Sequence, residues 1–245
     1  MELKICHLYP DLLNLYGDRG NIICLKKRLQ WRDIDVSVTE LPAGEQFDPS
    51  EFDLYFIGGG QDFEQGVLLS DLSEHKADAI RNAIEAEKVF LAICGGYQLL
   101  GNYYLTASGE RCDFLGAIDF HTIGHSERMI GDYMFECSPE NSGALVVGFE
   151  NHSGKTYLGS GISPLGRVLK GFGNNGEDST EGMRYKNVFG CYCHGSMLPK
   201  NPEFADYLLR IALENKYPGF ELPPLDDSIE TRAHAVITKR LGDSR

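Results

Sequence analysis

An apolar strand that runs through a cysteine and two glycines into a helix constrains the fold of this chain more than any other feature. The strand is predicted over 89–93, Cys94 follows it directly, and Gly95 and Gly96 lead into the helical segment. An uninterrupted apolar strand is typical of a sheet that helices cover on both faces. Small residues on either side of the cysteine let the backbone turn sharply. The turn would raise Cys94 above the sheet edge, at the positive end of a helix dipole that favours a thiolate.

Alternating strands and helices predict the fold class. Apolar strands are expected over 3–8, 36–38, 54–57 and 89–93, and apolar residues recur at helical spacing after the first and the third of them. A βαββαβα series with buried strands is typical of α/β proteins with a doubly wound, largely parallel sheet.

The sequence pattern changes in the second half of the chain. From about residue 113 the predicted strands are shorter, and turns rich in glycine and asparagine separate them. We expect the strands over 133–137, 145–149 and 188–193 to form an antiparallel extension of the same sheet.

Two helical segments, over 204–213 and 229–237, close the chain, and the second of them is amphipathic. No repeat, low-complexity tract or interdomain linker interrupts the pattern. We therefore predict a single domain over residues 1–245, with a C-terminal helical segment from about residue 226.

Composition and charge exclude several classes of protein. A chain of 245 residues with 42% hydrophobic content can bury a large core. Its net charge of −13 opposes binding to nucleic acid or to anionic lipid. No run is apolar enough to span a bilayer, the first residues do not resemble a secretion signal, and seven cysteines without framework spacing favour a reducing compartment. We expect a cytoplasmic protein with no direct membrane insertion and no nucleic-acid partner.

A cysteine nucleophile needs a base, which is normally distant in sequence and adjacent in space. His194 is the best placed histidine, because it ends the strand predicted over 188–193 and would reach the same sheet edge as Cys94. His152 is the closest rival, since it also follows a predicted strand. The alternative for Cys94 itself is a small apolar side chain that ends a core strand, because free cysteines are often buried.

Neither a metal site nor a nucleotide site is expected. Strand alternation sends Cys193 and His194 to opposite faces, and no second pair of ligands lies nearby at zinc-site spacing. The glycine run Gly58–Gly60 lacks the Gly-Lys-Ser/Thr of a phosphate-binding loop. Cys191 and Cys193 are expected in the core.

Backbone amides can supply the donors that acyl transfer needs for its oxyanion. The amide of Gly95, directly after the cysteine, is one candidate. Gly59 or Gly60, at the end of the neighbouring strand, could provide the second, and Gly60 is our choice.

Together these segments resemble the class I glutamine amidotransferases. The cysteine turn Cys94–Gln98, the glycine loop Gly58–Gly60 and the strand end Gly190–Gly195 carry this broad resemblance. A narrower resemblance is to the cobyric-acid-synthase-type glutaminases, and among them to the glutaminase subunits of lipid II isoglutaminyl synthases. The segments that carry this narrower resemblance lie over 13–21, 148–152 and 171–175.

The resemblance implies a reaction and further site residues. Cys94 would attack the side-chain amide of L-glutamine to form a γ-glutamyl thioester and release ammonia, and His194 would carry the protons. Gln98 and Arg128 would bind the substrate, with the arginine fork suited to the α-carboxylate of glutamine.

One departure from the wider family concerns the group that orients the histidine. Many amidotransferases carry a glutamate two residues after the histidine, whereas this chain has Gly195 and Ser196. The site would therefore be a Cys-His dyad, or another acid would complete it. Our hypothesis is that a partner subunit supplies the carboxylate.

The resemblance also implies a partner. Amide synthesis from a carboxylate needs ATP, and this chain carries no nucleotide motif, so ATP and Mg are expected on a Mur-ligase-like (MurT-like) synthetase subunit in a heterodimer. That subunit would amidate the D-glutamate of the lipid II stem peptide to D-isoglutamine. The complex would be cytoplasmic and would reach the inner membrane face through the lipid II that it binds. The alternatives are a corrin precursor as acceptor, a catalytically silent docking module, and a thiol hydrolase with another substrate.

Overall fold

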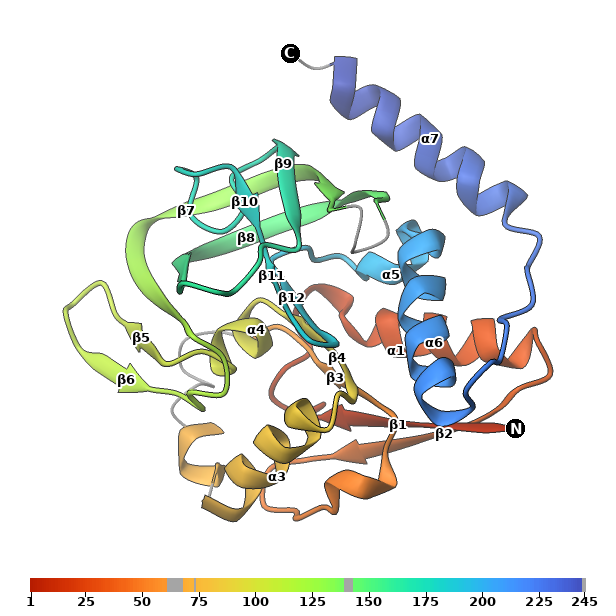
Figure 1. The fold of residues 1–245 in the computed structure, drawn as a ribbon. Helices are drawn as coiled ribbons and strands as arrows, with labels where there is room; N and C mark the ends of the chain where they lie inside the picture. Colours follow the sequence, from red (N-terminus) through yellow and green to blue (C-terminus); the bar gives the residue numbers. More distant parts are fainter. Residues whose placement is uncertain (61–67, 73, 139–142, 244–245) are drawn as a thin grey trace.

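The computed structural model describes residues 1–60, 68–72, 74–138 and 143–243, and within these residues the strands form two sheets (Figure 1). The first sheet has the order β11-β12-β4-β3-β1-β2, and its neighbouring strands are parallel except for β11 with β12. Its strands are β1 (Glu2–Leu8), β2 (Asp35–Leu41), β3 (Leu54–Ile57), β4 (Val89–Ile93), β11 (Met183–Tyr185) and β12 (Val188–Cys191). The predicted α/β class with a largely parallel sheet is confirmed.

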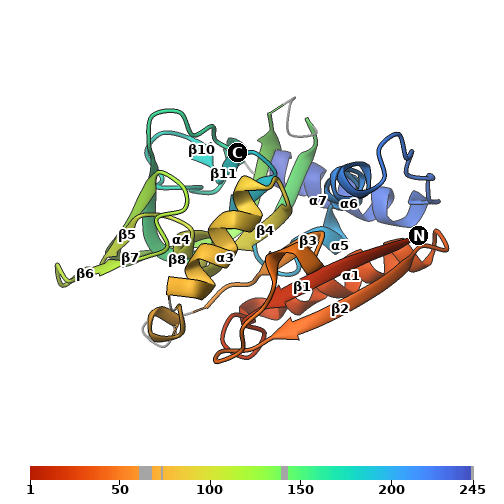
Figure 2. The ribbon, with the colours of Figure 1, turned by 60° about the horizontal axis from the view of Figure 1, so that its bottom comes forward.

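Helices cover both faces of this sheet, which is why its central strands are apolar throughout. Every residue of β3 and β4 is buried. The helices α1, α5 and α6 pack together on one face, and α3 lies on the other (Figures 1 and 2). The helical elements before the C-terminal helix are η1 (Leu15–Gly17), α1 (Arg19–Gln30), η2 (Pro49–Glu51), α3 (Glu74–Glu85), α4 (Gly95–Leu99), α5 (Met197–Lys200) and α6 (Pro202–Lys216).

The second sheet has the order β10-β9-β7-β5-β6, and β8 pairs with β7. Its strands are β5 (Tyr103–Leu105), β6 (Arg111–Asp113), β7 (Phe120–Cys137), β8 (Leu145–Leu158), β9 (Gly166–Lys170) and β10 (Thr180–Glu181). The long strands β7 and β8 form an antiparallel hairpin whose register shifts between Gly124 and Met129. An isolated antiparallel bridge between Phe149 and His194 joins this sheet to the segment that follows β12.

The placement of the later strands differs from the prediction. The strands expected over 133–137 and 145–149 belong to β7 and β8 in the second sheet, whereas Val188–Cys191 is an internal strand of the first sheet and runs parallel to β4. The antiparallel strand that extends the first sheet is β11. The physical reason is burial: all of β12 is buried, as in a parallel strand covered on both faces, while β8 alternates between buried and half-buried residues.

The last helix, α7 (Ser228–Asp243), lies at the outside of the fold in Figure 1 and contacts α5, β7 and β8. Leu241 and Ile237 pack against Met134 of β7 and Val147 of β8. Arg28, a buried residue of α1, holds the segment before α7 in place. Its guanidinium donates hydrogen bonds to Asp227 in that segment and to Asp206 of α6. No helix in the described ranges is long and apolar enough to cross a membrane.

Candidate active site

Cys94 occupies a strained turn between β4 and α4. Its backbone is left-handed, with φ +49° and ψ −106°, a conformation that costs energy in a residue with a side chain and persists only where neighbours hold it. Its amide donates to the carbonyl of Cys191 at 2.8 Å. Gly96 has no room for a side chain, because a Cβ there would lie 2.6 Å from Cγ2 of Ile57. The turn therefore places Cys94 at the carboxyl edge of the parallel sheet, as the small flanking residues predict.

His194 reaches the same edge because β12 lies beside β4 and runs in the same direction. Its backbone is fixed across the two sheets: its amide donates to the carbonyl of Phe149 at 2.7 Å, and its carbonyl accepts from the amide of Phe149 at 3.3 Å. The side chain of His194 is fully buried. The structure thus places Cys94 and His194, the predicted nucleophile and base, at the same edge of the sheet.

A carboxylate of this same chain faces the histidine. Oδ2 of Asp18 lies 3.4 Å from Nδ1 of His194, within ion-pair distance, and both side chains are fully buried. The same oxygen accepts a hydrogen bond of 2.8 Å from the amide of Gly59, which fixes the carboxylate. Asp18 is therefore an alternative, within this chain, to the carboxylate that we expect from a partner subunit.

A sequence signal for Asp18 existed. It lies within 13–21, one of the segments that carry the narrower family resemblance, and immediately before α1. An aspartate there would ordinarily cap the helix, but Asp18 makes no side-chain capping bond. Its carboxylate is directed at Gly59 and His194 instead.

Gly59 is the point on which the three side chains converge. A Cβ on Gly59 would lie 2.5 Å from Cε1 of His194, 3.1 Å from Oδ2 of Asp18 and 3.4 Å from Cβ of Cys94. Glycine is required here for space, with no contribution from an unusual backbone angle. The glycine run at the end of β3 is thus part of the wall of the site.

Opposing influences set the pKa of His194. Burial lowers this pKa, but the interactions of the ring with Cys94 and with Asp18 raise it by more, so the net result is a rise from the ordinary value of 6.5 to about 10. This rise favours the protonated imidazole at neutral pH. A protonated ring in this position can donate a proton to a leaving amine.

The two expected oxyanion donors lie next to each other. A Cβ built on Gly95 would stand 2.9 Å from the amide nitrogen of Gly60, so the glycine loop and the start of α4 are in contact. The amide of Gly59 is taken by Asp18. Of the two candidates in the loop, Gly60 is the one whose amide is not used for that bond, and Gly60 stays our prediction for the second donor.

The residues expected to bind substrate differ in their surroundings. Gln98 is on α4 and is 5% exposed, and its Nε2 donates to the hydroxyl of Tyr192 at 3.0 Å. Arg128 is exposed and lies where the register of β7 against β8 shifts, the kind of irregularity that redirects a side chain. Its Nε donates to Oδ1 of Asn151 at 2.9 Å.

His152, the rival base, is held in the interior. Its ring stacks on Tyr192 at a centroid distance of 3.6 Å, and its Nδ1 lies 2.9 Å from the carbonyl of Gly154. Its Nε2 lies 3.6 Å from Oε2 of Glu150. These contacts assign His152 to a buried polar network. Cys191 and Cys193 are also fully buried, as expected.

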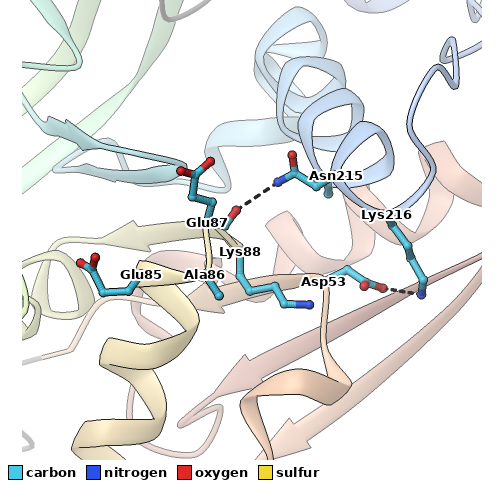
Figure 3. A pocket seen from close by; sticks show the side chains of 8 residues that line it. Asp53, Glu85, Ala86, Glu87, Lys88, Asn215 and Lys216 are labelled. Carbon is cyan, nitrogen blue, oxygen red and sulfur yellow. Dashed lines mark hydrogen bonds and ion pairs between the residues drawn. The ribbon is translucent and has the colours of Figure 1, made fainter.

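Metal ligands and hollows elsewhere give no competing site among the described residues. No group of three or more His, Cys, Asp or Glu residues there could hold a metal ion. A hollow of about 510 Å³ lies at the opposite edge of the sheet, where Asp53 precedes β3 and Lys88 precedes β4 (Figure 3). Lys216 and Asp53, which both line it, form an ion pair of 2.8 Å (Figure 3). Cys94 lies at the other end of β4, after Ile93.

Comparisons with known proteins show the family and the fold of this chain. Residues 4–202 match the CobB/CobQ-like glutamine amidotransferase domain. The chain is 44% identical to the lipid II isoglutaminyl synthase (glutamine-hydrolyzing) subunit GatD of Staphylococcus aureus, over 98% of this chain and 96% of that protein. It is 43% identical to the GatD subunit of Streptococcus pneumoniae, over 92% and 86% respectively. A solved glutamine amidotransferase from Thermotoga maritima has a similar fold, with a TM-score of 0.56 and 16% identity over 99% of each chain.

Proposed function

Because the chain belongs to the CobB/CobQ-like glutamine amidotransferase family, we propose that it is the glutaminase subunit of a lipid II isoglutaminyl synthase. It hydrolyses L-glutamine and delivers the ammonia to a synthetase subunit. The observation that carries this proposal is the convergence of Cys94, His194 and Asp18 on Gly59 at the carboxyl edge of the sheet.

The first half of the reaction uses the charged pair. The Cys94 sulfur attacks the side-chain amide carbon of glutamine, and the carbonyl oxygen becomes an oxyanion that accepts hydrogen bonds from the amides of Gly60 and Gly95. Protonated His194 donates its proton to the amide nitrogen. The C–N bond then breaks, ammonia leaves, and a γ-glutamyl thioester remains on Cys94.

The second half restores the site. Neutral His194 takes a proton from water, and the hydroxide attacks the thioester carbon. The C–S bond breaks, glutamate is released, and the thiolate and the protonated ring are regenerated. Asp18 holds the imidazole in one orientation and stabilises its charge throughout, as the third member of a triad does.

Arg128 and Gln98 are assigned to substrate binding. The guanidinium has five N–H donors in a rigid fork, and a carboxylate accepts two of them in parallel. We assign the α-carboxylate of glutamine to Arg128. Gln98 lies one helical turn beyond Cys94, and its hydrogen bond to Tyr192 fixes its side chain. We propose that it contacts the reacting end of the substrate.

The acceptor reaction takes place on a partner. The GatD relatives are named as subunits of a lipid II isoglutaminyl synthase, and we extend this to the present chain. A Mur-ligase-like subunit, MurT-like in type, would bind ATP and Mg, activate the D-glutamate carboxylate of the lipid II stem peptide and receive the ammonia. The two subunits would form a heterodimer in the cytoplasm, at the membrane face where lipid II is bound.

Transfer of labelled nitrogen tests this proposal. Glutamine carrying ¹⁵N in its side-chain amide is incubated with the chain, its co-expressed partner, ATP, Mg and lipid II. The proposal predicts ¹⁵N in the isoglutamine of the product, and none when Cys94→Ser replaces the wild-type chain. A parallel reaction contains a corrin precursor in place of lipid II. Label in the corrin precursor but not in lipid II would favour the other acceptor, and no release of label from glutamine would favour a silent docking module.

A further inference from the structure

The ring of Tyr16 covers the imidazole of His194 from the outside. The two ring centroids are 4.8 Å apart, with an interplanar angle of 66°, which is an edge-on contact. The same ring lies 6.2 Å from the ring of Phe149, the residue that pairs with the backbone of His194. Tyr16 is 43% exposed, whereas His194 is fully buried. The tyrosine therefore forms part of the boundary between the catalytic histidine and solvent.

Tyr16 is held in this place by its backbone and by the neighbouring loop. Its φ of +54° is left-handed, which a residue with a bulky side chain rarely adopts. On one side of it the amide of Leu15 donates to the carbonyl of Gly59 at 3.0 Å, and on the other the carbonyl of Gly17 accepts from Oγ of Ser196. The segment that carries Tyr16 is thus attached both to the glycine loop and to the chain just after His194.

One asparagine links Tyr16 to the candidate substrate residue. Nδ2 of Asn151 donates to the hydroxyl of Tyr16 at 2.6 Å, while Oδ1 of Asn151 accepts from Nε of Arg128 at 2.9 Å. Nη2 of Arg128 also donates to the carbonyl of Asn151, at 3.3 Å. An amide group with its oxygen on one residue and its nitrogen on the other fixes the positions of both.

From these contacts we infer that Tyr16 is a positioning residue: its ring covers His194, and its hydroxyl, through Asn151, couples that cover to the binding of glutamine by Arg128. The inference rests on the proposed glutaminase function for the part played by Arg128. Two residues would then hold His194 in place. Asp18 faces its Nδ1, and the ring of Tyr16 covers it on the side toward solvent. A carboxylate drawn to Arg128 would then bind next to a cover already in place.

The ring and the hydroxyl have separable tasks. The ring limits the access of water and solutes to the Cys94–His194 pair, which keeps the interaction between their charges strong. The hydroxyl only completes the connection to Asn151. Removal of the hydroxyl should therefore weaken glutamine binding, whereas removal of the ring should also expose the catalytic pair.

Three measurements on Tyr16→Phe and Tyr16→Ala test the inference. The full chain, co-expressed with its partner, is assayed for kcat and KM in glutamine hydrolysis. The rate at which iodoacetamide alkylates Cys94 is measured over a range of pH, which needs no glutamine. For Tyr16→Phe we expect kcat within about threefold of wild type and KM raised about three- to tenfold. For Tyr16→Ala we expect kcat at least tenfold lower, with Cys94 alkylated at least threefold faster.

The controls are Tyr103→Phe and Tyr103→Ala, because Tyr103 on β5 also contacts a histidine ring, that of His121 at 5.0 Å. These should leave all three quantities unchanged, and thermal unfolding checks that every variant is folded. Wild-type kcat and alkylation rate in Tyr16→Ala would overturn the inference. An equal loss of kcat in Tyr16→Phe and Tyr16→Ala would also overturn it, because the ring, which Phe keeps, would then contribute nothing separate from the hydroxyl. If the wild-type complex hydrolysed no glutamine, the proposed function would fail, while the alkylation rates would still decide whether Tyr16 covers the site.

Discussion

Oδ2 of Asp18 lies 3.4 Å from Nδ1 of His194 and 2.8 Å from the amide nitrogen of Gly59, so one carboxylate oxygen connects the start of α1, the loop after β3 and the segment after β12. These three parts of the chain are far apart in sequence. Their meeting point is the place where a catalytic histidine needs an orienting acid. Asp18, in the N-terminal region of this chain, is therefore our candidate for the group that the sequence lacks after the histidine.

Replacement of Asp18 by asparagine should impair catalysis while leaving the shape of the site unchanged. The amide cannot stabilise the charged imidazole, and its N–H group can favour the wrong tautomer. We expect kcat for glutamine hydrolysis to fall by about two to four orders of magnitude, the usual range for losing such a group. Asp18 helps to raise the pKa of His194, so this pKa should be lower in Asp18→Asn. The pH profile of Cys94 alkylation, which reports the loss of the proton from His194, should therefore shift to lower pH.

Asp35→Asn is the matched control, since Asp35 is exposed at the start of β2. It should leave the kinetics unchanged. Full activity of Asp18→Asn in the complex would show that the orienting acid comes from elsewhere, and a carboxylate of the partner would again be the best candidate.

Gly59→Ala should damage the site for lack of space. The added Cβ would lie 2.5 Å from Cε1 of His194, a separation that real contacts essentially never show, so the imidazole would have to move. We expect at least a tenfold loss of kcat, together with a destabilisation of roughly 1–3 kcal/mol from overpacking, measured by steady-state assay and urea unfolding. Gly242→Ala is the control, because a Cβ at Gly242 would meet nothing within 4 Å. Unchanged activity of Gly59→Ala would contradict the close packing around His194.

The raised pKa of His194 predicts a pH-dependent contribution to stability. A histidine whose pKa is about 10 in the folded state and about 6.5 in the unfolded state contributes its full stability below pH 6.5 and loses it as the pH rises toward 10. The stability advantage of wild type over His194→Gln should therefore shrink between pH 6.5 and pH 10. Urea unfolding of both proteins at several pH values measures this difference, and an advantage that stays constant across the window would contradict the shift.

Arg128→Ala should act on glutamine binding more than on chemistry. Loss of a carboxylate contact made equally in the ground state and the transition state raises KM and leaves kcat nearly unchanged. We expect KM for glutamine to rise at least tenfold, and Arg128→Lys to recover only part of this, because lysine lacks the planar fork. Arg111→Ala, at an exposed arginine of β6, should have no effect. An unchanged KM in Arg128→Ala would remove this residue from the substrate site.

Local sequence patterns predicted the central strands β3 and β4 and the turn at Cys94, for a physical reason. The strands β3 and β4 are buried on both faces, so an apolar run leaves few other structures, and the turn at Cys94 requires the small residue at Gly96. The edge at which Cys94 and His194 meet follows from the parallel pairing of β4 with β12.

Long-range pairing was predicted less well, because it depends on contacts between distant segments. The residues of β7 and β8 alone do not indicate that these strands form a second sheet, and the backbone bridge between Phe149 and His194 joins residues that are far apart in sequence. Asp18 and Tyr16 were missed as site residues for the same reason. They lie before α1 and become part of the site only when that loop folds over the segment after β12.

The decisive measurement is the release of glutamate from L-glutamine by the chain with its co-expressed partner, compared with Cys94→Ser in the same complex. We expect steady release by the wild-type complex and none above background from Cys94→Ser, because an unactivated hydroxyl cannot replace the thiolate. Release at the wild-type rate from Cys94→Ser, or no release from the wild-type complex, would contradict the proposed function.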